Sequence, residues 1–148
     1  MKLRHALVLS AALLGATAAQ AQFQKPEDAL KYRQSALFVM GQHFSRIGAM
    51  TSGRVRFDAK LAQENAAVVV AMSKLPWAGF TPNTENLKSN ARPELWMEMD
   101  KVKAAADKMM ASAVALESAT KTGNLDAVKK AFGDTAASCK ACHDNYRE

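Results

Sequence analysis

The sequence predicts an all-α protein, folded as an antiparallel four-helix bundle. Apolar residues recur at spacings of three and four in four stretches, and prolines, glycines or capping residues separate those stretches. No stretch alternates apolar and polar residues as a strand would. The chain has 148 residues, 49% of them apolar and 23% charged, which suits one domain with a buried core. We find no internal repeat and no second domain.

Residues 1–21 have the pattern of a secretory signal peptide. Two basic residues precede an apolar stretch over residues 6–16, and Ala19 and Ala21 supply the small residues of a cleavage site. No apolar run reaches the roughly 18 residues that a membrane-spanning helix needs, so we predict no membrane span. The 20 basic residues are scattered among 14 acidic ones, which disfavours nucleic-acid binding. The predicted mature domain is therefore 22–148, in an oxidising compartment.

The first helix is predicted to begin at Pro26, since proline is tolerated in a first helical turn, and to end between Gly48 and Gly53. Its seam, the stripe of residues facing the core, is Leu30, Arg33, Leu37, Met40, Phe44 and Ile47. The second helix is predicted to follow the capping residue Asp58 and to stop at Pro76. Its seam is Leu61, Asn65, Val68, Met72 and Leu75.

Beside the second seam, Val69 and Val70 add further apolar surface, which either a second neighbour in the bundle or a second copy of the chain would cover. Residues 76–93 then form the longest irregular segment, and loops of that length are usually functional or mobile. The third helix is predicted from Pro93 to Gly123, with the seam Leu95, Met99, Val102, Ala106, Met109, Ala113 and Leu116. The fourth, capped by Asn124, has the seam Leu125, Val128, Phe132, Thr135, Cys139, Cys142 and Tyr146.

The fourth helix carries the motif Cys139-Lys140-Ala141-Cys142-His143, a C-x-x-C-H site. In an exported chain this motif predicts one covalently attached haem c, with thioethers to both cysteines and His143 as an axial ligand of the iron. At about 100° per residue, the two sulfurs and the imidazole fall within an arc of about 100° on one face of a helix. Both cysteines also belong to the seam, which places the haem inside the bundle.

Other uses of the two cysteines fit less well. A redox disulfide of the thioredoxin type needs its cysteines at a helix N-terminus, whereas this pair lies near a helix end. A structural zinc site needs four ligands, and only three are clustered here. An inert disulfide across two residues would distort a helix. A thiol oxidoreductase without haem is therefore the weakest of three functional hypotheses. The other two both involve haem.

The remaining face of the iron has two candidate neighbours on the first seam. If Leu37 covers it, the site is five-coordinate, apolar and tight, and it admits a small neutral gas. If Met40 reaches it, the protein is a low-spin one-electron carrier. The residue pattern leaves both interpretations open.

Two arginines have candidate roles at the same site. Arg33 is the charged residue of its seam, and it either pairs with a haem propionate, with Gln34 donating beside it, or extends to solvent at the end of the bundle. Arg147 follows His143 by four residues, hence by about one helical turn. It either shapes access to the proximal side or is a solvated residue favoured by the helix dipole.

The late C-x-x-C-H motif followed by Arg147 resembles cytochrome c′, the high-spin class II c-type cytochromes. The resemblance covers essentially the whole of residues 22–148. Five further segments are similar to that family: Gln22–Ala29, Tyr32–Ala36, Leu75–Phe80, Ala91–Glu94 and Ala131–Asp134.

The resemblance implies a periplasmic four-helix bundle, a homodimer, with five-coordinate haem iron and a vacant apolar distal face. It implies that Leu37 is the distal residue, that Arg33 and Gln34 meet the haem edge, and that Arg147 is the proximal basic residue. Methionine-ligated low-spin relatives carry methionine near position 37, so Leu37 argues against that class.

The resemblance also assigns residues of the loop to the haem surroundings. Trp77 and Phe80 match aromatic residues packed around the haem. The family often carries a Thr-Glu pair or an acidic residue before the position of Arg92, and Ser89 and Asn90 are the matching residues here.

The function implied is binding of NO and CO, with NO able to displace the proximal histidine. The physiological role that the resemblance implies for the protein is NO handling, one-electron transfer with periplasmic partners, or both. The alternative is a Met/His-ligated electron carrier. We predict no enzyme activity, because no nucleophile–base pair and no paired carboxylates accompany the proposed site.

Overall fold

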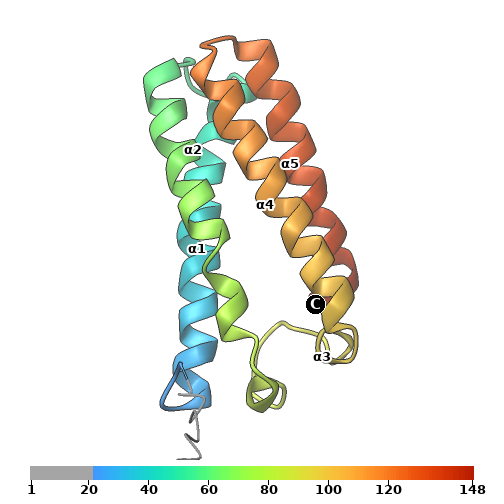
Figure 1. Cartoon of the computed structure of the whole chain (residues 1–148). Helices are drawn as coiled ribbons and strands as arrows, with labels where there is room; N and C mark the ends of the chain where they lie inside the picture. The colour runs from blue at the N-terminus through green and yellow to red at the C-terminus, as the bar shows by residue number, and fades with distance from the viewer. Residues whose placement is uncertain (1–21) are drawn as a thin grey trace, which may run out of the picture.

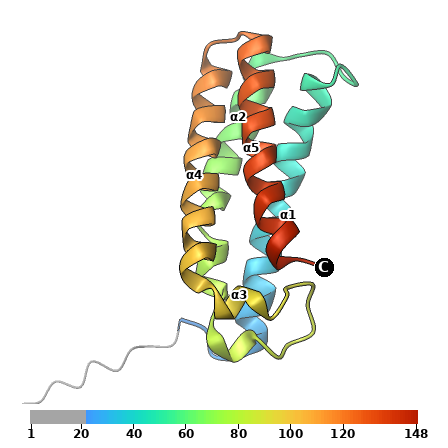
Figure 2. The same ribbon diagram turned by 90° about the vertical axis from the view of Figure 1, so that its right-hand side faces the viewer.

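The computed structural model describes residues 22–148, so the predicted signal peptide lies outside the described residues. Four long antiparallel helices form the bundle, as predicted (Figure 1, Figure 2). They are α1 (Pro26–Thr51), α2 (Ala59–Ser73), α4 (Met99–Lys121) and α5 (Leu125–Tyr146). Short elements lie between α2 and α4: the 3₁₀ turns η1 (Pro76–Gly79) and η2 (Pro82–Thr84), and one turn of α-helix, α3 (Glu94–Met97). Within residues 22–148, no helix is both long and apolar enough to cross a bilayer.

The predicted helix boundaries follow from local chemistry. The Asp58 carboxylate accepts from the backbone N–H of Leu61 and caps α2. Asn124 caps α5 by accepting from the N–H groups of Asp126 and Ala127. Gly123, with φ of 69°, makes the left-handed turn that ends α4.

The prediction of one continuous third helix after Pro93 is wrong. Glu98, with φ of −118° and ψ of 36°, separates α3 from α4. The Glu98 carboxylate accepts from Tyr146 Oη at 2.8 Å and from Lys101 Nζ at 2.7 Å. These contacts hold the break in place against the end of α5.

One end of the bundle, the closed end, has a dense apolar core. Its fully buried members are Ile47, Met50, Ala62, Ala66, Leu116 and Val128. The predicted seam of α2 is wrong at Leu61, which is 46% exposed. The alanines at 62 and 66 face the core instead, because small side chains let the helices approach closely. Val69 is buried within the bundle as well.

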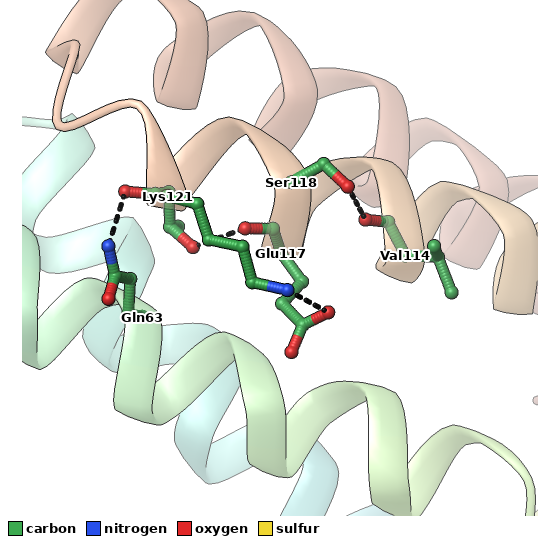
Figure 3. A network of polar contacts seen from close by, with 6 residues as sticks. Gln63, Val114, Glu117, Ser118 and Lys121 are labelled. Atoms are coloured by element: carbon green, nitrogen blue, oxygen red, sulfur yellow. Dashed lines mark hydrogen bonds and ion pairs between the residues drawn. The ribbon is translucent and has the colours of Figure 1, made fainter.

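Polar contacts border this closed end (Figure 3). Gln63 of α2 donates to the carbonyl oxygen of Thr120 of α4, 3.3 Å away. Lys121 pairs with Glu117, and Ser118 donates to the carbonyl of Val114. The first contact joins the two helices, whereas the others remain within α4.

The fourth side of the bundle, between α1 and α5, is different. The pairs α1–α2, α2–α4 and α4–α5 pack extensively, whereas α1 and α5 contact each other sparsely. Near the closed end the rings of Phe44 and Phe132 stack with centroids 4.2 Å apart. A Cβ on Gly48 would lie 2.8 Å from Cζ of Phe132. Away from this contact the two helix pairs diverge (Figure 1).

Candidate functional site

A cavity of about 700 Å³ fills the divergent half of the bundle, the cavity end. Its wall is formed by α1, α5, the 76–95 segment, one residue of α2 and two residues of α4. The predicted site residues that line it are Arg33, Gln34, Leu37, Phe80, Ser89, Asn90, Cys139, Cys142, His143 and Arg147. The structure therefore brings together every residue that the sequence analysis assigned to the site. Trp77 and Met40 line the cavity as well.

The C-x-x-C-H motif lies in the last two turns of α5. Cys139 and Cys142 are half-buried free thiols, and burial raises the pKa of both. His143 lies at the edge of the cavity, still open to solvent. Burial, followed by the charge of Arg147, lowers the pKa of this imidazole. A neutral imidazole can use a ring nitrogen to ligate a metal.

Arg33 is 2% exposed, so the interpretation that it extends to solvent is wrong. Its Nη1 donates to the Gly79 carbonyl at 2.8 Å and to Thr84 Oγ1 at 2.6 Å. The guanidinium carbon lies 4.6 Å from the ring centroid of Phe80 and 5.4 Å from that of Trp96. Burial lowers the pKa of this guanidinium. Nη2 is also buried, and it has no hydrogen-bond partner in the structure.

An unpaired buried cation is costly unless a group of opposite charge joins it. Arg33 lines the cavity, so an anionic group of a bound molecule is the natural partner for Nη2. A cavity with two thiols, an imidazole and this spare donor fits a flat, largely apolar group that carries carboxylates. The residues present therefore suit a covalently attached haem.

The sequence analysis missed the residues that position Arg33. Thr84 is fully buried, and its hydroxyl accepts from Arg33 while donating to the Thr81 carbonyl at 2.7 Å. Position 79 needs glycine, because a Cβ there would lie 2.6 Å from the Ala29 carbonyl oxygen. Thr84 and Glu85 form a Thr-Glu pair in this loop, five residues before Ser89 and Asn90, the residues that the family resemblance matched to such a pair.

The end of α5 holds the rest of the loop in place. Ala91 and Arg147 form an isolated antiparallel bridge. The N–H of Arg92 donates to the Tyr146 carbonyl, and the N–H of Glu148 donates to the Asn90 carbonyl. These contacts fix Asn90 and Arg147 along one rim of the cavity.

On α1, Leu37 and Met40 both line the cavity. His43 does not: its Nδ1 lies 2.9 Å from Asn65 Oδ1, on the side facing α2. His43 follows Leu37 by six residues, which places it about 240° around the helix and away from the Leu37 face. Arg33, Leu37 and Met40 thus mark three levels of the wall opposite α5.

The comparisons with known proteins agree with this arrangement. The family model for Cytochrome C' matches residues 28–147. Cytochrome c' of Rubrivivax gelatinosus is 46% identical over 128 residues, which span 86% of this chain and 99% of the relative. Cytochrome c' of Alcaligenes xylosoxydans xylosoxydans is also 46% identical, over 86% of this chain and 98% of the relative.

Solved structures give the same result. The crystal structure of cytochrome c' from Rubrivivax gelatinosus superposes with a TM-score of 0.82 at 46% identity, over 86% of this chain and all of that one. A nitric oxide complex of a variant of cytochrome c prime from Alcaligenes xylosoxidans gives 0.80 at 43% identity, over 86% and 98% of the two chains. The chain therefore belongs to the cytochrome c′ family, whose cofactor is covalently attached haem c.

Proposed function

We propose that this chain is a periplasmic haem protein that binds NO and CO at a five-coordinate iron, and that it is not an enzyme. When bound, haem c supplies an iron centre with one position for a diatomic ligand. Cys139 and Cys142 hold the haem through thioethers, His143 is the proximal ligand, and Leu37 lies over the vacant distal position. The solved nitric oxide complex of a variant of a 43% identical relative supports NO as a ligand.

The observation that carries the proposal is the register of α1 against α5. Phe44 and Phe132 stack, so they lie at the same level of two antiparallel helices. Counting from that level at 1.5 Å per residue, His143 is offset along the bundle by about 6 Å from Leu37 and by about 10 Å from Met40. Side chains tilt toward the N-terminus of their helix, which brings Leu37 and His143 closer together. This geometry favours Leu37 as the distal residue.

The surroundings hold the cofactor without adding a ligand. Arg33 and Gln34 line the cavity from one level of α1, and the unpartnered Arg33 Nη2 together with the amide of Gln34 suits the haem propionates. Phe80 and Trp77 cover the same end, and Ser89 and Asn90 lie on the rim. Arg147 is adjacent to His143 on the proximal side, where it affects any ligand that replaces the histidine.

We also propose a periplasmic homodimer. Export is supported by the predicted leader in residues 1–21. A second copy of the chain would cover apolar side chains that are exposed on the outer faces of α1 and α2, among them Val39 and Leu61.

The alternative is a low-spin electron carrier with Met40 as the sixth ligand, because Met40 also lines the cavity. The visible spectrum of the reduced holoprotein, before and after addition of NO, separates the two. We expect a broad high-spin spectrum that changes readily with NO. Met40→Leu should leave the spectrum unchanged, whereas Leu37→Met should produce sharp low-spin bands and slow NO binding.

Sharp low-spin bands in the wild type that become high-spin in Met40→Leu would reassign the protein as an electron carrier. An intact mass without covalent haem would reject both haem functions. It would favour the remaining hypothesis, a thiol oxidoreductase that uses Cys139 and Cys142.

A further inference from the structure

One edge of the cavity is formed by residues that are exposed to solvent. Gln34, Phe38 and Gly41 of α1 line the cavity, yet all three are exposed. Phe38 is 66% exposed, which is unusual for a phenylalanine that borders a cavity. The cavity therefore opens to solvent along this edge of α1.

The positions of these residues around the helix show which edge it is. At about 100° per residue, Gly41, Gln34 and Phe38 lie about 40°, 60° and 100° to one side of Leu37. Phe44 and Met40 lie about 20° and 60° to the other side. Leu37 thus stands between the buried wall and the open edge.

The opposite side of the opening belongs to α5. Gly41 precedes Phe44 by three residues, and Ala136 follows Phe132 by four, so these two small residues lie at nearly the same level. Both line the cavity, and a Cβ on Gly41 would have no atom within 4 Å. A gap therefore remains between α1 and α5 just below the Phe44–Phe132 stack.

Other walls lie inside the bundle, whereas His143 and Arg147 at the end of α5 line the cavity and are exposed. Val69 of α2, Met109 of α4 and Thr135 of α5 line the cavity from inside the bundle. Arg33 and its aromatic neighbours close the end near η1. The gap at Gly41 adjoins Leu37, which lies one helical turn away and about 40° around α1.

We propose that the gap between Gly41 and Ala136 is the route by which a diatomic gas passes between solvent and the space beneath Leu37, and that the Phe38 ring partly covers this route. The inference rests on the proposed function, because it assumes a vacant distal position. The inference gives these residues different roles. Leu37 limits which ligands fit at the iron, whereas Gly41 and Phe38 limit the rates at which the gas enters and leaves the cavity.

This division has a kinetic signature. A side chain that narrows a route raises the barrier equally in both directions, so it lowers the association and dissociation rate constants together and leaves Kd unchanged. A side chain that touches the bound ligand changes Kd. Exposed aromatic rings change rotamer in picoseconds to nanoseconds, so Phe38 slows passage without preventing it.

The experiment measures CO association, CO dissociation and geminate rebinding after photolysis in the holoprotein. We expect Gly41→Leu to lower both rate constants roughly fivefold or more and to increase the geminate fraction, with Kd and the visible spectrum preserved. Phe38→Ala should raise both rate constants. The matched control is Gly133→Leu, at an exposed helical glycine of α5 that has nothing within 4 Å and does not line the cavity.

Unchanged rates in both Gly41→Leu and Phe38→Ala would overturn the route. A change in Kd with an unchanged geminate fraction would also overturn it, because that pattern indicates contact with the bound ligand. The proposed function fails by a different result, a wild-type protein that takes up no CO, and the route fails with it.

Discussion

The two ends of the bundle solve the problem of filling their interior in opposite ways. The closed end is complete from the side chains of the chain: Ile47, Ala62, Leu116 and Val128 are fully buried, and helices approach closely over alanines. The cavity end encloses about 700 Å³ and buries a charge, Arg33, that has a spare donor. The comparison shows that the side chains of the chain alone fill the closed end, whereas the interior of the cavity end is completed by the bound cofactor.

The energetic consequences differ accordingly. At the closed end a change of volume acts directly on packing. At the cavity end the stability depends on a bound group and on hydrogen bonds to a buried cation. The two ends should therefore respond to different substitutions.

The largest effect is expected from removing the attachment of the haem. In the double variant Cys139→Ser, Cys142→Ser, hydrogen-exchange protection in the 76–97 segment should fall roughly a hundredfold or more, because the bound group no longer stabilises that end. Protection around Ile47 and Leu116 should change much less. Exchange measured by mass spectrometry resolves the two regions.

The control for that experiment is Ala141→Ser, which adds a hydroxyl on the exposed side of the same motif. An equal loss of protection at both ends in the double variant would mean that the bundle opens as one cooperative unit.

The second effect concerns the closed end. Gly48→Val should lower the free energy of unfolding by roughly 1–3 kcal/mol, because even a Cβ at this position meets the Phe132 ring. Urea midpoints of the holoprotein measure the loss. Gly133→Val, at an open position of α5, should be nearly neutral. Similar losses in both variants would indicate a helix-propensity effect in place of crowding.

A smaller effect is expected at Thr84. Thr84→Val removes one acceptor from the buried Arg33 guanidinium and should cost about 1–2 kcal/mol, since the Gly79 carbonyl still accepts from Nη1. Thr81→Val, which removes an exposed hydrogen bond to Asn83, should cost less than about 0.5 kcal/mol. If the two urea midpoints shift equally, Gly79 alone positions the guanidinium.

The smallest effect is a pH dependence. Hydrogen bonds from Lys101 and Tyr146 hold the pKa of the Glu98 carboxyl below its ordinary value. The folded state therefore gains stability from this carboxylate above the ordinary pKa, and loses it as the pH falls through the lowered one. Glu98→Gln should flatten the acid side of a stability-against-pH curve measured by urea unfolding. Tyr146→Phe, which removes one donor, should flatten it less, and an unchanged acid side would contradict the assignment.

Most of the bundle could be predicted from the sequence because its signals are local. Asp58, Gly123 and Asn124 act within one helical turn, and each has its predicted role. The break at Glu98 could not be predicted, because no proline or glycine marks it and its partner Tyr146 is 48 residues away. Leu61 was placed on the core because large apolar residues dominate a periodic pattern, whereas the close approach of α2 selected Ala62 and Ala66.

The site residues likewise fall into those that could be predicted from the sequence and those that could not. Cys139, Cys142 and His143 share a face of one helix, so their convergence followed from helical geometry. Thr84 is 51 residues from Arg33, and only the tertiary fold joins the two. Burial of Arg33 was not decided by its seam position alone; the docking of η1 and η2 against α1 settles it.

The Phe44–Phe132 contact has a mechanical consequence. Two stiff helices that meet near one end and diverge toward the other behave as a pair of levers about that contact. Arg33 lies 11 residues below Phe44, about 16 Å along α1. A tilt of about 5° at the stack displaces that level by about 1.4 Å, nearly the length of a carbon–carbon bond. A substitution in the closed end that tilts the helices at this contact is therefore expected to change the width of the cavity at the level of Arg33, even where the substituted residue does not line the cavity.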